Sequence, residues 1–345
     1  MKKLLVTTII ALCMLGSIAL AADKELLGAG ATFPMPVYTK MFDTYNKNTG
    51  IKVNYQGVGS GAGITQLTNK TVDFGATDAF MSNEEMKKAG AGVLHIPVVL
   101  GSVVLTYNLP GNPKLKFSPG TIADIFLGKI IRWNNPKIAA DNAGVSLPDM
   151  EIAVVHRSDG SGTTYIFSDY LTKVSVEWKS GTGTGKSLKW PTGLGAKGNP
   201  GVAGLIKQLP GSIGYVELIY ALQNKMPVAS VKNKSGVFVE PTIKSTSSAA
   251  NIALPADTRA SITDTAAKDG YPIGGFTWII IYREQKYGNR TKEQADSLLK
   301  LLWWMTHDGQ SIAEPLQYAP LPKDVIAKTE AILKSATFGG AKILK

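Results

Sequence analysis

Three short loops of Gly, Ser and Thr residues, each placed directly before a helix-like segment, most strongly narrow the folds open to this chain. They cover residues 28–34, 57–63 and 157–163. Patterns typical of strands lie just before the second and third loops: apolar and polar residues alternate at 51–56, and residues 152–155 have the pattern of a buried strand. A strand that passes through a small-residue loop into a helix is the repeating pattern of α/β proteins, so we predict an α/β fold.

The rest of the chain continues this alternation of strand and helix patterns. Further strands are predicted at 72–75, 98–107 and 276–282, and helices at 36–48, 122–126, 163–173, 291–306 and 323–334. Residues 180–201 are rich in Gly, Ser and Thr, but Trp190 and Leu194 lie among them, so we expect an ordered loop rather than a linker. The strongly apolar stretch 98–107 is a candidate to run between two lobes.

The first residues carry the pattern of an export signal. Lys2 and Lys3 precede an uncharged apolar run, and the run ends at Ala19-Leu20-Ala21, a small-x-small cleavage pattern. We therefore predict a cleaved signal peptide over residues 1–22 and a periplasmic mature protein. A membrane anchor is the alternative, because the run approaches the length of a spanning helix.

Composition limits the chemistry and the domain count. Cys13 is the only cysteine of the 345 residues and lies in the signal, so the mature chain has no disulfide and no cysteine nucleophile. Its length exceeds a single ordinary core and favours two domains. The net charge of +11 fits an anionic ligand, nucleic acid or a membrane surface. Because the Lys residues are scattered along the chain, a solvated cationic surface accounts for most of this charge, and we expect no nucleic-acid partner.

The three loops are candidate anion sites. Free backbone N–H groups and the positive end of the helix dipole favour an anion there, and Ser or Thr adds a hydroxyl donor. In the third loop, Arg157 is suited to bidentate contact with a tetrahedral oxyanion, and Asp159 is placed to hold its guanidinium. Asp78 fits beside an anion only if the ligand carries a proton, which phosphate does and sulfate does not. The plainer alternatives are helix caps for the hydroxyls and for Asp78, and a surface ion pair for Arg157.

Two segments resemble nucleotide-binding motifs, but this interpretation is weaker than that of an anion site. Gly57-x-Gly59-x-x-Ala62 resembles a dinucleotide fingerprint, with Asp78 at the distance of a ribose contact, and residues 181–187 resemble a P-loop with Ser180 in place of its first Gly. An exported protein meets little nucleotide, so we set both aside.

An exported phosphatase or other hydrolase remains an alternative, although the sequence gives it little support. Ser60 and Ser161 lack the Gly-x-Ser-x-Gly elbow, and His95, His156 and His307 show no metal-ligand spacing. We expect a binding protein rather than an enzyme, with no catalytic residues, no metal and no cofactor.

Several motifs together closely resemble the periplasmic phosphate-binding proteins of the phosphate-specific (Pst) ABC importers. The matching stretches are GAGATFPMPVY at 28–38, VNYQGVGSGAG at 53–63, VDFGATDA at 72–79, HRSDGSGTTYIFSDYL at 156–171, WPTGLGAKGN at 190–199 and LPGSIGYVE at 209–217. The resemblance covers nearly the whole mature chain. It implies a two-lobed periplasmic-binding-protein fold of type II, with two crossover hinge segments and the ligand cleft between the lobes. Lobe 1 would comprise residues 23–105 and 278–345, and lobe 2 residues 106–277.

The same resemblance implies a phosphate site without metal. The residues expected to contact phosphate are Thr32, Phe33, Ser60, Asp78, Arg157, Ser161, Gly162 and Thr163, with Asp159 supporting Arg157. Gly61 stands where many relatives carry a second Ser, and His156 and Ser158 flank the Arg motif where other residues are common. None of these departures replaces an expected ligand group.

The resemblance also implies partners. The chain would be a soluble monomer that captures inorganic phosphate by hinge closure. It would deliver the ligand to an ABC importer with two permease subunits and ATPase subunits on the cytoplasmic side. A receptor for another tetrahedral oxyanion is a further alternative, against which Asp78 argues.

Overall fold

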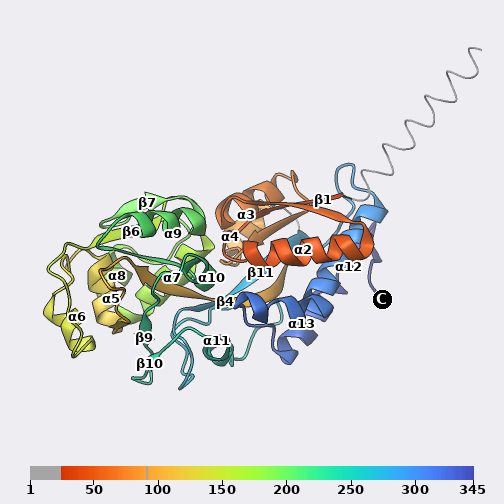
Figure 1. Cartoon of the computed structure of the whole chain (residues 1–345). Helices are drawn as coiled ribbons and strands as arrows, with labels where there is room; N and C mark the ends of the chain where they lie inside the picture. Colours follow the sequence, from red (N-terminus) through yellow and green to blue (C-terminus); the bar gives the residue numbers. More distant parts are fainter. Residues whose placement is uncertain (1–24, 91) are drawn as a thin grey trace, which may run out of the picture.

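Two α/β lobes joined by long strands make up the molecule (Figure 1). A computed structural model describes residues 25–90 and 92–345. The predicted signal peptide, residues 1–22, lies outside the described residues. Within the described part, no helix is both long and apolar enough to cross a membrane.

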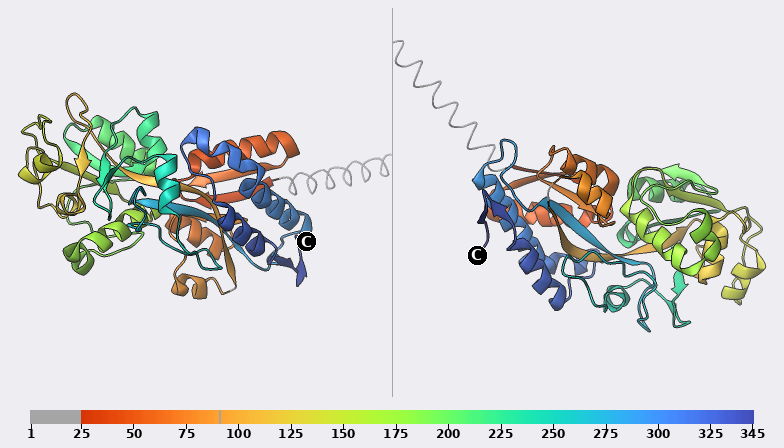
Figure 2. Two further views of the ribbon diagram at one scale, coloured as in Figure 1. Left: turned by 90° about the horizontal axis from the view of Figure 1, so that it is seen from below. Right: turned by 180° about the vertical axis from the view of Figure 1, so that it is seen from behind.

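One eight-stranded sheet runs through both lobes. Across the sheet the strands are β2 (Lys52–Gly57), β1 (Glu25–Gly30), β3 (Phe74–Thr77), β11 (Gly274–Tyr282), β4 (Val93–Tyr107), β8 (Ser212–Glu217), β6 (Ala153–Arg157) and β7 (Leu194–Ala196). Strand β4 pairs antiparallel with β11 up to Ser102 and with β8 from Val103 onward. The chain therefore passes from one lobe to the other within a single strand, which the two views of Figure 2 show clearly.

Helices cover each half of the sheet. The first lobe contains β1 to β3 and β11, with helices α2 (Met35–Thr49), α3 (Ser60–Thr68), α4 (Asn83–Lys88), α12 (Lys292–Thr306) and α13 (Lys323–Leu333). The second lobe contains β6 to β8, with helices α5 (Pro119–Phe126), α6 (Pro136–Asp141), α7 (Gly162–Val174), α8 (Val176–Gly181), α9 (Gly198–Gln208) and α10 (Leu218–Gln223). Figure 1 shows the C-terminus on the first lobe.

Smaller elements complete the chain. They are the strands β5 (Lys116–Phe117), β9 (Ser230–Lys232), β10 (Phe238–Val239), β12 (Thr337–Phe338) and β13 (Ala341–Lys342), helix α11 (Ile243–Ala249) and the 3₁₀ turns η1 (Asp308–Ile312) and η2 (Glu314–Leu316).

The predicted α/β class and two-lobed architecture are confirmed. Every predicted strand and helix has a counterpart within a few residues of its expected bounds. The loop at 180–201 is ordered, as expected, and it also contains the end of α8, the short strand β7 and the first turn of α9, which were not predicted.

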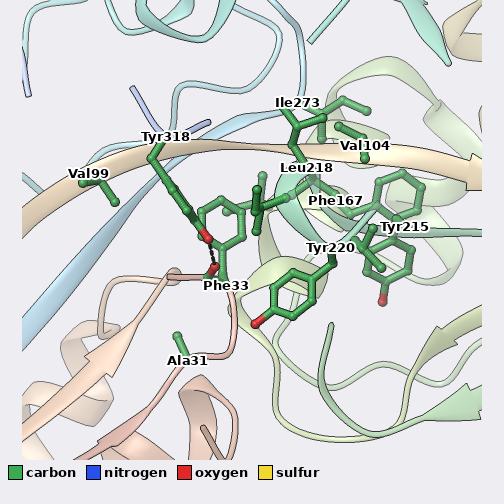
Figure 3. Packing of buried hydrophobic residues seen from close by; sticks show 14 of the residues in the cluster. Ala31, Phe33, Val99, Val104, Phe167, Tyr215, Leu218, Tyr220, Ile273 and Tyr318 are labelled. Atoms are coloured by element: carbon green, nitrogen blue, oxygen red, sulfur yellow. Dashed lines mark hydrogen bonds between the residues drawn. The ribbon is translucent and has the colours of Figure 1, made fainter. Parts of the chain in front are cut away.

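The core is continuous where the lobes meet. Every residue of β4 and of β11 is buried, so both strands read as long apolar runs. Figure 3 shows aromatic side chains from both lobes packed beside β4. Among them, the Tyr318 hydroxyl donates to the Phe33 carbonyl oxygen at 2.7 Å, and the two rings meet edge to face with centroids 6.4 Å apart. This packing fixes the first predicted anion loop against the hinge.

Candidate functional site

The loops that carry Thr32, Ser60 and Asp78 lie together because the strands before them are parallel neighbours. Strands β2, β1 and β3 pair in parallel and end at Gly57, Gly30 and Thr77. Ligand sites of open α/β sheets lie outside the carboxyl ends of such strands. The Gly30 carbonyl accepts hydrogen bonds from Val58 N at 2.9 Å and from Gly59 N at 2.8 Å, so the first two loops are tied to each other.

Ser60 and Asp78 meet at the first turn of α3. Ser60 Oγ accepts from Asp78 N at 3.2 Å and lies 3.5 Å from Asp78 Oδ2. It also accepts from Gly162 N of the second lobe at 3.0 Å. Asp78 does not cap a helix, because the N-cap of the next helix, α4, is Ser82. The helix-cap alternative for Asp78 is therefore wrong.

Burial controls the charge of Asp78. Desolvation raises the pKa of this carboxyl to about 7, against the opposing effects of the Thr277 hydrogen bond, the Arg157 charge and the Ser60 hydroxyl. Thr277 Oγ1 of β11 donates to Asp78 Oδ1 at 2.9 Å. Near neutral pH, Asp78 can thus exist with or without a proton, which suits it to share one with a ligand.

On the second lobe, Arg157 and Asp159 form a buried bidentate pair. Arg157 Nε donates to Asp159 Oδ1 at 2.7 Å and Nη2 donates to Oδ2 at 2.6 Å, and the Arg157 side chain is only 1% exposed. Burial by itself would raise the pKa of Asp159, but Arg157 and the Gly198 N–H at 3.0 Å hold this pKa below its usual value. A permanent cation with a fixed orientation results, so the alternative of an ordinary exposed surface pair is wrong.

The first residues of α7 follow directly. Ser161 Oγ accepts from Thr164 N at 3.0 Å and so caps α7, which was the plainer alternative for this hydroxyl. Its own proton remains free to donate. Thr163 Oγ1 accepts from Arg157 Nη1 at 3.2 Å. The start of α7 thus places the Gly162 N–H against Ser60 of the other lobe, between two residues that carry hydroxyl groups.

Thr32 and Phe33 are held by partners from distant parts of the chain. Thr32 Oγ1 accepts from Asn199 N at 3.1 Å and from Asn199 Nδ2 at 3.0 Å. The Tyr220 hydroxyl, which Figure 3 shows pointing toward this loop, donates to the Thr32 carbonyl at 2.5 Å. The structure therefore brings all eight predicted contact residues and Asp159 into one cluster between the lobes.

Sequence reasoning missed several residues of this cluster. Asn199, Thr277, Tyr220 and Glu217 touch the predicted residues or their neighbours. Glu217 is fully buried, and burial keeps the pKa of its carboxyl well above its usual value. Asn199 and Glu217 lie inside the quoted motifs WPTGLGAKGN and LPGSIGYVE, which was the one available signal.

The two lobes are in direct contact around the cluster. Gly61 N donates to the Gly160 carbonyl at 2.8 Å, and Lys186 Nζ lies 2.7 Å from Glu85 Oε1. The hollow beside Asp78 has a volume of about 10 Å³, whereas larger hollows of about 530 and 580 Å³ lie elsewhere, at residues such as Lys116 and Lys244. The donors described above converge at the cluster rather than at these larger hollows.

The histidines do not assemble a nucleophile with a base. His95 Nε2 accepts from Met81 N at 3.0 Å, and burial lowers its pKa to about 3. The His156 ring stacks on Trp190, and His307 stacks on Trp303 of α12. None of the three forms a hydrogen bond with Ser60 or Ser161. Residues 25–90 and 92–345 also contain no group of three His, Cys, Asp or Glu side chains suited to a metal ion.

Comparisons with known proteins identify the family and the fold. Residues 17–308 match the PBP superfamily domain. The chain is 44% identical to the phosphate-binding protein PstS of Pasteurella multocida over 317 residues, which cover 90% of each chain. It is 42% identical to the phosphate-binding protein PstS of Haemophilus influenzae, over 93% of this chain and 96% of that one.

A solved structure supports the fold alone. The phosphate-binding protein of Stenotrophomonas maltophilia superimposes with a TM-score of 0.68 at 19% identity, over 89% of this chain and 93% of that one.

Proposed function

Because the chain belongs to the PstS family of phosphate-binding proteins within the PBP superfamily, we propose that it captures inorganic phosphate between its lobes for an ABC importer. The observation that carries this proposal is the convergence of donors around one carboxyl group. The helices α2, α3, α7 and α9 all begin at the cluster, and each adds the positive end of its dipole. Arg157 adds a fixed guanidinium.

Each site residue has a proposed role. Thr32, Phe33 and Gly162 supply backbone N–H groups, while Thr32, Ser60, Ser161 and Thr163 supply hydroxyl donors. Arg157 makes the charged contact, with Asp159 holding it. Asp78 shares a proton with the ligand.

Asp78 supports phosphate over other tetrahedral oxyanions. An ionised carboxylate accepts a hydrogen bond from a P–OH group, whereas fully ionised sulfate offers no proton and meets repulsion. Sites built on a required hydrogen bond reject analogues that lack it by about 10⁴–10⁵.

Transport would proceed by hinge closure. The first lobe carries Thr32, Phe33, Ser60 and Asp78, and the second carries residues 157–163. Phosphate that bridges them favours the closed state by its differential affinity. We place lobe 1 at residues 23–105 and 278–345 and lobe 2 at 106–277. The change of partner of β4 between Ser102 and Val103 lies near the first boundary, and the second boundary falls within β11, which pairs with β3 and with the first part of β4.

The cellular setting follows from the same family. We propose a periplasmic monomer that performs no catalysis and needs no cofactor. Its closed form would dock on two permease subunits, with ATPase subunits on the cytoplasmic side.

The test is calorimetric titration of phosphate into mature protein that has been unfolded, stripped of ligand and refolded. Sulfate and a chromogenic phosphate ester are run alongside. We expect tight 1:1 binding of phosphate alone. Turnover of the ester, abolished in Ser60→Ala or Ser161→Ala, would instead make the chain a hydrolase, and tight sulfate binding would make it a different receptor.

A further inference from the structure

One buried amide touches ligand hydroxyls of both lobes. Asn199 lies at the start of α9 and is fully buried. Its Nδ2 donates to Thr32 Oγ1 of the first lobe and to Thr163 Oγ1 of the second, each at 3.0 Å. Its backbone N–H donates to Thr32 Oγ1 at 3.1 Å.

The orientation of this amide is fixed by its other end. Asn199 Oδ1 accepts from the backbone N of Glu217 at 2.9 Å. Because a backbone N–H can only donate, the oxygen of the amide must face β8, and the NH₂ group must face the two threonines.

The consequence for the threonines follows from the capacity of a hydroxyl group, which accepts two hydrogen bonds and donates one. Thr32 Oγ1 accepts two from Asn199. Thr163 Oγ1 accepts one from Asn199 and one from Arg157 Nη1 at 3.2 Å. Both oxygens have used their acceptor capacity, so each hydroxyl proton is left to donate.

We propose that Asn199 is a positioning residue that forces Thr32 and Thr163 to act as donors and thereby makes this part of the site specific for a hydrogen-bond-accepting anion. The inference rests on the proposed function. Since Asn199 and Thr32 belong to different lobes, the polarity of Thr32 is set only when the lobes close. Closure and ligand recognition are then the same event at this hydroxyl.

Two substitutions test the proposal by phosphate calorimetry. Asn199→Ala removes the side-chain NH₂ group, so each threonine hydroxyl regains one free acceptor position. We expect phosphate affinity to fall about 10- to 100-fold. In Asn199→Asp the bond from Glu217 N is kept, but a carboxylate oxygen now accepts the hydroxyl protons. We expect a larger loss at pH 8 than in Asn199→Ala, with partial recovery as the pH is lowered toward 5 and the new carboxyl takes up a proton.

A double-mutant cycle separates positioning from folding. If Asn199 acts through the Thr32 hydroxyl, the effect of Asn199→Ala must shrink by at least about threefold in a Thr32→Val background. Asn233→Asp is the matched control, because Asn233 is a buried amide of the second lobe that holds loop backbone at Lys268 and Gly270. This control is expected to lower thermal stability and to leave phosphate affinity unchanged.

The outcomes are distinguishable. Wild-type affinity in both Asn199 variants, or equal effects of Asn199→Ala with and without Thr32→Val, would overturn the inference while the receptor function stands. If Asn199→Ala does not fold, the pH profile of Asn199→Asp decides. No phosphate binding by the wild-type protein would overturn the proposed function itself.

Discussion

Arg157 and Asp78 belong to different lobes of the cluster. Both are buried, but only Arg157 has a bidentate ion-pair partner. Arg157 forms a close ion pair with Asp159. Asp78 lacks a bidentate partner of this kind, so desolvation dominates and its pKa is raised to about 7. A site with one fixed cation and one carboxyl near its titration point can match the proton content of its ligand.

Arg157→Ala should weaken phosphate binding severely. Removal of the guanidinium leaves Asp159 as a buried, unpaired carboxylate beside the anion, and breaking a buried ion pair in this way costs about 3–5 kcal/mol of free energy. We expect an affinity loss of at least about 100-fold by calorimetry. The double variant Arg157→Ala with Asp159→Ala should recover part of this loss. Unchanged binding in Arg157→Ala would disprove the site assignment.

Asp78 also predicts how selectivity depends on pH. Below its pKa of about 7 the carboxyl is neutral and can donate to an anion without a proton; above it, the carboxylate repels that anion. Sulfate affinity should therefore rise as the pH falls from 8 to 5. In Asp78→Asn, sulfate should bind at all of these pH values. Sulfate affinity that stays flat with pH in the wild type would contradict this role for Asp78.

The same carboxyl should affect stability. The pKa of Asp78 is higher in the folded protein than in the unfolded chain. Its contribution to the stability of the fold is therefore complete below about pH 4 and is lost as the pH rises to about 7. Asp78→Asn should therefore stabilise the ligand-free protein at pH 8, by up to about 1.4 kcal/mol per unit of pKa shift, and change it little at pH 4. Denaturant titration at the two pH values measures this difference.

Helix α3 packs closely on the sheet at a glycine. A Cβ at Gly63 would lie 2.6 Å from Gly30 Cα and 2.8 Å from the Ala76 carbonyl oxygen, both backbone atoms of β1 and β3. Because those strands cannot yield cheaply, the position of Ser60 at the start of α3 depends on this contact.

Gly63→Ala should thus push α3 away from β1 and β3. We expect a loss of about 1–3 kcal/mol in unfolding free energy and weaker phosphate binding through displacement of Ser60. Gly204→Ala is the matched control, because Gly204 lies inside α9 with nothing within 4 Å of the new methyl group. That variant should gain up to about 1 kcal/mol from helix propensity. A stabilising Gly63→Ala would show that the helix is not seated as described.

A further ion pair joins the two lobes of the molecule. Lys186, in the segment that resembles a P-loop, reaches Glu85 of α4 at 2.7 Å, and its carbonyl accepts from Ser161 N at 2.8 Å. The segment therefore connects the second-lobe site loop with the first lobe instead of cradling a nucleotide.

Lys186→Met should loosen the closed form. The pair is partly exposed, so we expect only about a two- to fivefold loss in phosphate affinity, smaller at high salt, with faster release. Lys47→Met serves as control, since Lys47 pairs with Asp43 inside one helix of the first lobe. Stopped-flow measurement of release decides, and equal rates in wild type and Lys186→Met would show that this pair does not contribute to closure.

Local sequence predicted the strand–loop–helix units, because hydrophobic periodicity and small-residue loops determine them within about twenty residues. It could not predict Asn199 or Tyr220 as partners of Thr32, since those contacts join positions 167 and 188 residues apart. Their importance arises only when the lobes meet. Likewise, the raised pKa of Asp78 depends on burial between β3, β11 and α7, which no single segment encodes.

The backbones of the two lobes approach each other so closely at Gly59 that no side chain fits between them. Gly59 has φ +96°, and a Cβ there would lie 2.4 Å from Asp159 Oδ2 and 2.8 Å from the Gly160 carbonyl oxygen of the opposite lobe. One added methyl group at position 59 would therefore hold the two lobes apart, although every proposed ligand group would still be present. Such a variant would separate two properties of the proposed transport complex, the bound phosphate and the closed conformation of the lobes.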